Sequence, residues 1–393
     1  MRPAFVLAML QCVFLASITL AGSAEVPVAA DAIQPHLAID RDGTIYLVCL
    51  HRGNISVAVS RDRGKSFSAP VVAIDVQGRQ RGGKQRGPRI GVDDNKVVHV
   101  TAPVVLDNSE FGRKYPVSDL VYVQSRDGGK TWSTPVRINE VAKKAPEALH
   151  WMAVSRAGLV HVSWLDIRDR NGPGQDLFYA KISDGKVSPN VAVAHTVCTC
   201  CAPGLALDAS GNPALAYREG EDKDSREILL LRSSDGGQTF SKPVRINQEP
   251  TNEFACPMSA PAVALSPDGK NFAAAWKVRR SGKSSSQVYW VLGTPSTLSK
   301  DALVHGQLAK HDHPSLVFDD AGAVWCAWED TRHGTQQVFA RRSTKDGDFP
   351  VSEAREGAAG FPALAANAGL VAIAYESSTA KGSSVRFRLL LAK

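Results

Sequence analysis

The stretch Ser60-Arg61-Asp62-Arg63-Gly64-Lys65-Ser66-Phe67 decides the fold, because the chain contains it in three versions. The other two are Ser125-Arg126-Asp127-Gly128-Gly129-Lys130-Thr131-Trp132 and Ser233-Ser234-Asp235-Gly236-Gly237-Gln238-Thr239-Phe240. All three fit the pattern S-x-D-x-G-x-[ST]-[FW], and a Ser-x-Pro follows each copy. The three Asp residues lie 65 and 108 residues apart, close to one and two units of a common length. Repetition at this period is typical of propellers, solenoids and arrays.

The residue types in the repeat explain why it recurs. Ser and Asp side chains accept hydrogen bonds from the backbone of a tight turn, and Gly adopts a positive φ without a clash. A strand-like run precedes each copy, at 55–59, 120–123 and 228–231. We therefore predict hairpin turns in which Asp62, Asp127 and Asp235 are structural and the aromatic ring folds back into an apolar seam.

The repeated phrase resembles the Asp box of the BNR repeat family, which is best known from sialidases. The resemblance implies an all-β fold, a β-propeller of four-stranded blades. Upstream of the phrase, a Pro or small residue opens an apolar strand, an Asp-x-x-Gly turn follows, and a second strand ends in polar residues. This second element starts seven times, near residues 35, 88, 148, 203, 261, 314 and 362. The count predicts seven blades; the sialidase resemblance favours six as the alternative.

The ends of the chain suggest how it is exported and how the ring closes. Residues 1–24 have a short basic start, an apolar run and small residues at the end, as in a secretory signal peptide. An uncleaved anchor is the alternative for this segment. Residues 25–393 then form a single exported propeller, periplasmic or extracellular, with no further membrane span. The last unit has only three strands, and we expect residues 26–29 to supply its fourth.

The polar residues at one end of the units are candidates for ligand binding. They lie where chains enter first strands or leave second strands, positions that converge on the central channel. The basic candidates are Arg89, Arg168, Arg218, Arg279 and Arg332. Two segments repeat the pattern W-x-D-x-R, with Asp166 and Asp330 at the centre. A ring of such groups predicts a binding site; the alternative is that Asp–Arg pairs brace neighbouring blades.

The sialidase resemblance implies a set of catalytic roles. That family is described as using three Arg on the substrate carboxylate, a Tyr nucleophile paired with a Glu, and an Asp acid/base. Here Tyr375 would be the nucleophile, Glu219 its partner, and Asp166 or Asp330 the acid. The family's opening Arg-Ile-Pro is absent, because the first unit reads Gln34-Pro35-His36. The catalytic motif is thus incomplete, and an exo-sialidase-like glycoside hydrolase is one expectation among several.

The cysteines form a second candidate site. The chain has seven, of which Cys12 lies in the signal segment and Cys49 and Cys326 lie in apolar strands as expected free thiols. The remaining four, Cys198, Cys200, Cys201 and Cys256, open two adjacent units and are expected to meet. A Cys201–Cys256 or Cys198–Cys256 disulfide is the first expectation for an exported protein. The alternatives are a redox thiol, or a copper or zinc site completed by His311 and His313.

Three functional hypotheses follow from these features. The first is a sialidase-like propeller that binds a glycan or other acidic ligand at the channel mouth, near units 3 to 6, with glycoside hydrolase activity as an extension. The second is a metal- or redox-thiol-binding propeller that uses the Cys-x-Cys-Cys cluster. The third is a non-catalytic protein-interaction scaffold. The net charge of +7 is modest for 393 residues, and no nucleic-acid partner is expected.

Overall fold

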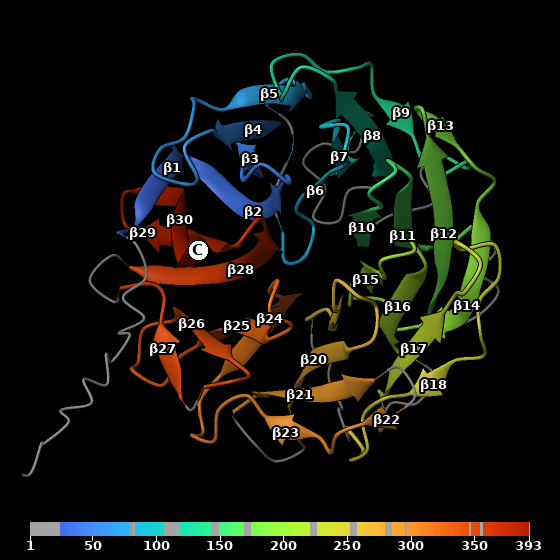
Figure 1. Ribbon diagram of the computed structural model, residues 1–393, viewed down its shortest axis with the longest axis vertical. Coiled ribbons are helices and arrows are strands. Elements are labelled where there is room, and N and C mark those ends of the chain that lie inside the picture. Colours follow the sequence, from blue (N-terminus) through green and yellow to red (C-terminus); the bar gives the residue numbers. More distant parts are fainter. Residues whose placement is uncertain are drawn as a thin grey trace, which may run out of the picture.

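The computed structural model is a ring of seven antiparallel sheets, and no helix occurs among the residues that it describes (Figure 1). These residues are 24–78, 80, 83–105, 118–142, 149–168, 174–220, 226–251, 258–279, 285–294, 297–345, 347–353 and 357–392. The predicted signal segment therefore lies outside them, apart from Ala24. None of the described elements is a helix long and apolar enough to cross a membrane. The prediction of seven blades is confirmed, and the six-bladed alternative is wrong.

Each blade is a short antiparallel sheet whose strands follow one another from the channel outward. Blade 1 contains β2 (Ala32–Ile39), β3 (Ile45–His51), β4 (Asn54–Ser60) and β5 (Val71–Ile74). Blade 2 contains β6 (Arg89–Val92), β7 (Val98–Val104), β8 (Asp119–Ser125) and β9 (Val136–Arg137). Blade 3 contains β10 (His150–Val154), β11 (Val160–Asp166), β12 (Gln175–Ser183), β13 (Lys186–Val187) and β14 (Val191–Val197). Blade 4 contains β15 (Gly204–Leu207), β16 (Pro213–Arg218), β17 (Ile228–Arg232) and β18 (Val244–Arg245).

The remaining blades complete the ring. Blade 5 contains β19 (Ala262–Leu265), β20 (Phe272–Val278), β21 (Gln287–Thr294), β22 (Thr297–Leu298) and β23 (Ala302–Leu303). Blade 6 contains β24 (His311–Phe318), β25 (Val324–Asp330), β26 (Gln337–Arg342) and β27 (Asp348–Pro350). Blade 7 contains β28 (Ala358–Asn367), β29 (Leu370–Thr379), β30 (Gly382–Ala392) and, as its fourth strand, β1 (Val26–Ala30).

The pairing of β1 with β30 confirms the expected closure of the ring. The register matches Val26 with Phe387 and Ala30 with Ser384. One blade is thus made from both ends of the chain, and it lies between blades 1 and 6. This arrangement closes the ring, because a strand from the start of the chain completes the last blade.

The core consists of seven apolar clusters, one in each seam between neighbouring blades. Second strands are covered on both faces, so β3, β7, β11 and β25 are buried along almost their whole length, and most of their residues are apolar. Because each seam buries side chains from two blades, a blade loses much of its apolar burial if its neighbour is removed.

The three repeated turns make the predicted hydrogen bonds. In the second turn, Ser125 Oγ donates to Asp127 Oδ1 at 2.8 Å and accepts from Gly129 N at 2.9 Å. The N–H and Oγ1–H of Thr131 donate to the Asp127 carboxylate at 2.9 and 2.6 Å. Equivalent bonds occur at Asp62 and Asp235. The acceptor capacity of each Asp is used within its own turn.

The aromatic residue that ends the repeat packs into the seam with the preceding blade, as predicted. Phe67 meets Phe387 of blade 7 with ring centroids 4.9 Å apart, and Phe240 meets Tyr179 of blade 3 at 5.0 Å. The turn therefore fixes one blade against the next. Its polar groups and its ring serve the architecture.

Candidate functional site

The best-defined pocket lies on the axis of the ring, at the end where the inner strands begin. Several blades each contribute a three-residue segment, x-Pro-x, to the wall of this pocket. The segments are Gln34-Pro35-His36, Gly87-Pro88-Arg89, Ala260-Pro261-Ala262, His313-Pro314-Ser315 and Phe361-Pro362-Ala363. Trp151 and Gln85 add side chains from blade 3 and from the loop before blade 2. The repeated frame thus presents a different side chain from each blade to one shared pocket.

Three of these positions have a strained backbone. Gln34, His313 and Phe361 adopt φ values of 53°, 44° and 51°, a region that non-glycine residues rarely occupy. Each lies at a register shift in the pairing of an inner strand, in β2, β24 and β28 respectively. Strain of this kind persists where the surroundings enforce it, and it concentrates at ligand sites. All three side chains line the pocket.

Carboxylates from neighbouring blades hold two of these bulges. Glu329 Oε1, at the end of β25, accepts the N–H of Phe361 at 2.8 Å. Glu376 Oε2, in β29, accepts the N–H of Gln34 at 3.3 Å. Burial raises the pKa of Glu376. These two carboxylates, which lie toward the ends of second strands, therefore shape the pocket partly by fixing the backbone of the next blade.

Arg89 is the main cation of the pocket. Its side chain is 7% exposed, and its guanidinium carbon lies 4.4 Å from the centre of the Trp151 ring. Nη1 donates to the carbonyl oxygens of Gly87 and Pro88, at 3.0 Å each, while Nε has no hydrogen-bond partner among the described residues. No described carboxylate forms an ion pair with it. Burial lowers the pKa of Arg89 to about 10, so the group is still cationic at neutral pH.

His36 lies beside Arg89 and is neutral. Its Nδ1 accepts the N–H of Ile90 at 3.3 Å, and its ring meets Trp151 edge-on. Burial, then the nearby charge of Arg89 and His150, lowers the pKa of His36 to about 3. The cationic side of the pocket therefore combines a guanidinium, a neutral imidazole and an indole.

His313 lies on another part of the pocket wall, among carboxylates. Its Nδ1 is 3.0 Å from Glu329 Oε1, and its ring packs on Phe361 with centroids 4.6 Å apart. Burial alone would lower the pKa of His313, but Glu329 and Asp312 outweigh it and raise that pKa. Lys277 Nζ contacts Asp312 at 2.6 Å, which leaves Asp312 already paired with an ammonium group.

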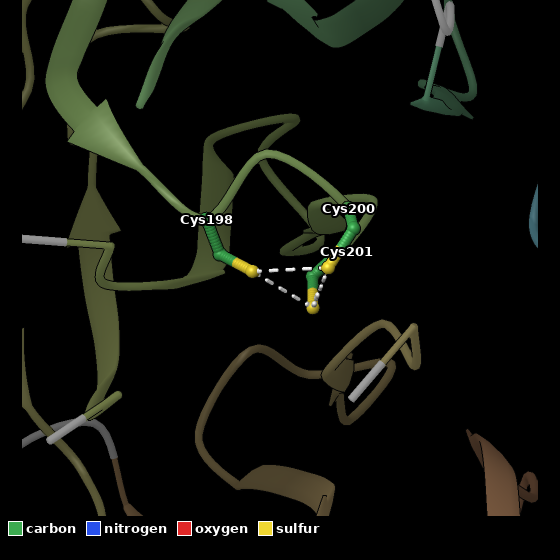
Figure 2. A group of neighbouring side chains, drawn as sticks. All are labelled: Cys198, Cys200 and Cys201. Atoms are coloured by element: carbon green, nitrogen blue, oxygen red, sulfur yellow. Dashed lines mark hydrogen bonds between the residues drawn. The ribbon is translucent and has the colours of Figure 1, made fainter. Parts of the chain in front are cut away.

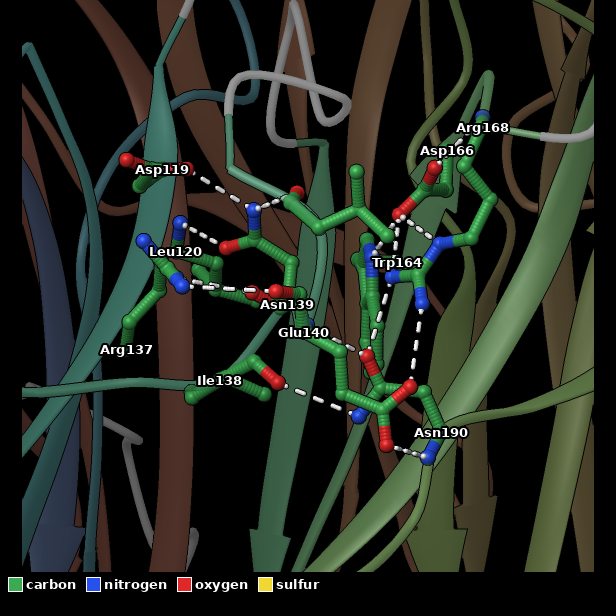
Figure 3. Close-up of polar contacts among 11 residues, drawn as sticks. Asp119, Leu120, Arg137, Ile138, Asn139, Glu140, Trp164, Asp166, Arg168 and Asn190 are labelled. Atoms are coloured by element: carbon green, nitrogen blue, oxygen red, sulfur yellow. Dashed lines mark hydrogen bonds and ion pairs between the residues drawn. The ribbon is translucent and has the colours of Figure 1, made fainter.

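The W-x-D-x-R segments are structural clamps outside this pocket. Figure 3 shows the first of them: Asp166 is fully buried and accepts bonds from the Trp164 indole at 3.0 Å and from Arg168 Nη2 at 2.7 Å. Arg168 stacks on Phe178 and reaches Asn190 and Glu140. These contacts agree with the alternative prediction for these segments, in which Asp–Arg pairs brace neighbouring blades.

The second clamp repeats these contacts in blade 6. Asp330 accepts from the Trp328 indole at 3.0 Å and pairs with Arg332, which also contacts Asp348 at 2.6 Å. His311 Nε2 lies 3.2 Å from Asp330 Oδ2. Neither clamp lines the pocket.

The other predicted catalytic and arginine residues are dispersed. Tyr375 is buried in the seam between blades 6 and 7, and its hydroxyl donates to Glu25. Arg218 is buried and donates to the carbonyl oxygens of Arg226 and Lys277. The backbone of Glu219 forms an isolated antiparallel β-bridge with that of Val197. Arg279 follows β20 and is exposed. Of the five predicted arginines, Arg89 lines the pocket, and the structure does not bring Tyr375 and Glu219 into it.

The cysteine loop of blade 4 differs from both predicted pairings. Cys200 is disulfide-bonded, whereas Cys198, Cys201, Cys49 and Cys326 are free. The predicted bonds from Cys198 or Cys201 to Cys256 are therefore wrong on the Cys198 and Cys201 side; Cys256 itself lies outside the described residues. The buried sulfurs of Cys198 and Cys201 contact each other at 3.2 Å (Figure 2). The half-buried Cys200 is the residue of this group that forms a disulfide.

The predicted metal set of cysteines and histidines is not assembled among the described residues. The three cysteine sulfurs group with one another, while His313 groups with Asp312 and Glu329 and His311 with Asp330. Because the Cys200 sulfur is already bonded, two thiols remain in that group. The composition of the cluster fits thiol chemistry better than a three-sulfur metal site.

Sequence reasoning did not single out Trp151, Phe361, Gln34 and Gln85. A usable signal existed, because x-Pro-x before an apolar pair recurs at the start of most units. The Pro by itself indicates only the start of a strand. The residues on either side of it are the ones that vary between blades and line the pocket.

Comparison with other proteins identifies the architecture. No protein-family model and no curated protein matches the sequence. Among solved structures, a protein of unknown function from Dyadobacter fermentans aligns over 94% of this chain and 98% of its own, with a TM-score of 0.54 and 15% identity. The GH93 α-L-arabinofuranosidase of Fusarium graminearum, solved with arabinobiose, aligns over 94% and 97%, with a TM-score of 0.54 and 13% identity.

A third structural neighbour is a trans-sialidase. The intramolecular trans-sialidase of Ruminococcus gnavus, solved with oseltamivir carboxylate, aligns over 79% of this chain and 92% of its own, with a TM-score of 0.50 and 12% identity. The chain has a β-propeller fold similar to that of these solved structures. At such low identity the likeness concerns the fold alone.

Proposed function

We propose that the axial pocket binds a carbohydrate that carries an acidic group, with Arg89 pairing with the acid and Trp151 and Phe361 packing against the sugar. The supporting observation is the state of Arg89: a buried guanidinium at a pocket wall, without an ion pair to any described carboxylate. A buried cation in this state is costly unless a ligand supplies an opposite charge or solvent supplies hydrogen bonds. Two structural neighbours are a trans-sialidase and an α-L-arabinofuranosidase, which agrees with this class of ligand.

The chemistry of the pocket separates acidic from neutral ligands. A carboxylate or sulfate beside Arg89 would gain charge-assisted hydrogen bonds in a site largely shielded from water. Neutral His36 adds a polar group without a competing negative charge. Trp151 and Phe361 offer flat apolar faces, and Gln34 and Gln85 offer amides for hydroxyl groups.

Isothermal titration calorimetry on the chain without residues 1–24 tests this proposal. The ligands are sialyl-oligosaccharides, oligogalacturonides and arabino-oligosaccharides, the last as the neutral set. We expect an acidic set to bind, with weaker binding at higher salt, and Arg89→Gln to weaken it at least tenfold. Arg61→Gln is the matched control, because Arg61 is exposed on a repeated turn and donates to Gly128. No binding of any acidic ligand would contradict the proposal and would favour a protein-interaction scaffold.

A second proposal concerns catalysis at the same pocket. His313 has a raised pKa, and a general acid works best when its pKa lies near the working pH. We propose that, if a bound glycoside is cleaved, His313 donates the proton and Glu329 holds the imidazole in place. Fluorogenic sialosides, uronides and arabinofuranosides give the readout. Turnover that survives His313→Gln would rule out this role.

The proposed location is the periplasm or the cell exterior, because residues 1–24 have the pattern of a secretory signal peptide. Expression of the full chain in a bacterial host, followed by N-terminal sequencing of the exported form, tests it. Cleavage near residue 24 is the expected result. A cytoplasmic, uncleaved product would contradict export.

A further inference from the structure

The cysteine loop of blade 4 contains an ordered group of three sulfurs that the proposed carbohydrate site does not use. Cys198 Sγ lies 3.2 Å from Cys201 Sγ and 3.5 Å from Cys200 Sγ, whereas Cys200 and Cys201 are 4.0 Å apart (Figure 2). Cys198 is therefore the sulfur that reaches both of the others. One neighbour is a free thiol and the other belongs to a disulfide.

The surroundings of Cys198 favour the thiolate, which is the nucleophilic form. Arg226 Nη1 donates to its sulfur at 3.4 Å, and the buried guanidinium of Arg218 lies nearby. The hydrogen bond with Cys201, more than the two arginines, lowers the pKa of Cys198 to about 6 against the opposing effect of burial. Burial and the same hydrogen bond raise the pKa of Cys201.

The two remaining free cysteines show that this environment is specific to the loop. Cys49 and Cys326 are fully buried in apolar seams, and burial raises the pKa of Cys49 to about 12. Neither makes a contact with another sulfur among the described residues. A buried thiol in this protein is thus inert by default, and Cys198 is different.

We infer that Cys198-Thr199-Cys200-Cys201 is a thiol–disulfide exchange site, in which Cys198 attacks the disulfide at Cys200 and Cys201 then resolves the new bond. This is a function beyond carbohydrate binding. The substrates are thiols and disulfides: first the disulfide of the protein itself, and then small thiols that reach the half-buried Cys200.

The exchange is balanced within the protein. In the first step, the Cys198 thiolate forms a bond to Cys200 Sγ, and the former partner of Cys200 leaves as a thiolate that takes a proton from solvent. In the second step, Cys201 loses its proton to solvent and attacks Cys198 Sγ, and Cys200 leaves as a thiolate. One disulfide is broken and one is formed, so no external oxidant or reductant is required.

The position of the loop gives the exchange a structural consequence. Ala202, the next residue after Cys201, donates its N–H to Gln85 Oε1 at 3.0 Å, and Gln85 lines the axial pocket. A disulfide between Cys198 and Cys201 would free Cys200 from its covalent anchor in a segment joined to the pocket wall. The exchange can be measured without any carbohydrate, so its failure and that of the proposed binding function are distinguishable.

A pH jump with mass-spectrometric mapping tests the inference. The chain without residues 1–24 is held at pH 4, shifted to values between pH 5 and 8, quenched in denaturant with N-ethylmaleimide, digested and mapped. We expect the original Cys200 disulfide to be lost at a rate that is half-maximal near pH 6, where the Cys198 thiolate forms. The Cys198–Cys201 disulfide is expected to follow in a second step that becomes faster across the whole pH range, because the pKa of Cys201 is raised. Arg226→Gln is expected to slow the loss of the original Cys200 disulfide at pH 6, by about fivefold if the pKa of Cys198 rises by one unit, because the thiolate fraction falls from about one half to about one eleventh.

Two further variants separate chemistry from folding. Cys201→Ser removes the resolving thiol, so it is expected to accumulate a Cys198–Cys200 bond and no Cys198–Cys201 bond. Cys326→Ala removes a buried thiol in blade 6, and the exchange is expected to proceed as in the parent protein. A circular-dichroism melt checks that each variant is folded.

Two results would overturn the inference. One is a Cys200 disulfide that stays intact at every pH while Cys198 and Cys201 remain free thiols. The other is a stoichiometric copper or zinc ion in the purified protein that protects both thiols from N-ethylmaleimide, which would identify a metal site instead.

Discussion

The pocket around Arg89 and the clamp around Arg168 each contain a guanidinium over an aromatic ring. They differ in whether a carboxylate pairs with that guanidinium. Both guanidiniums are buried over an aromatic ring, at 4.4 Å from Trp151 and 4.3 Å from Phe178. Arg168 has the fully buried Asp166 as its partner at 2.7 Å, whereas Arg89 has carbonyl oxygens only. The difference separates an arginine that stabilises the fold from one that is available to a ligand.

The largest expected effect comes from removing the acid of the clamp. Asp166→Ala leaves Arg168 buried without its main partner and also removes the acceptor of the Trp164 indole. We expect the free energy of unfolding to fall by about 3–5 kcal/mol. Urea denaturation followed by tryptophan fluorescence measures this change. A loss below about 1 kcal/mol would mean that the clamp and the pocket do not differ in the way described.

The second effect is a pH dependence that originates in the pocket. The folded-state pKa of His36 is about 3, below its ordinary value of 6.5, so the unfolded chain binds more protons between these values. The stability that neutral His36 contributes is therefore present above pH 6.5 and is lost as the pH falls toward 3. We expect about 2 kcal/mol of this loss between pH 7 and 5. Denaturation curves of the parent protein and His36→Gln measure it, and a variant with an unchanged slope would contradict the assignment.

The smallest effect on stability is expected at Arg89 itself. Arg89→Gln removes a buried charge that has no described ion-pair partner, so the lost packing on Trp151 is offset by lower desolvation. We expect the free energy of unfolding to change by no more than about 1 kcal/mol. Equivalent destabilisation by Arg89→Gln and Asp166→Ala, in the same urea assay, would show that both arginines are structural.

The fold was predictable because it depends on interactions between residues close in the sequence, and these interactions recur along the chain. The turns at Asp62, Asp127 and Asp235 use short-range hydrogen bonds, which depend on neighbouring residues alone. The closing strand at 26–29 followed from the missing fourth strand of the last blade. Such features need no knowledge of which blades face each other across the ring.

The site was predictable only in part, because it depends on contacts between distant segments. Arg89 was a candidate, but its role and that of Arg168 could not be separated without knowing that Asp166 folds back on Arg168. The hydroxyl of Tyr375 donates to Glu25, which directly precedes β1 at the other end of the chain, and no local pattern around Tyr375 indicates this partner. The three nearby cysteines likewise offer no local signal that Cys200 forms the disulfide while Cys198 and Cys201 stay free.

The most direct test of the account compares an acidic ligand with its neutral methyl ester in two proteins. Calorimetry is performed with both ligands on the parent protein and on Arg89→Gln, using the tightest acidic oligosaccharide found. We predict that esterification weakens binding at least tenfold in the parent protein and has little effect in Arg89→Gln, because the acid and the guanidinium act as one pair. An equal ester penalty in both proteins would contradict the claim that Arg89 recognises the acidic group.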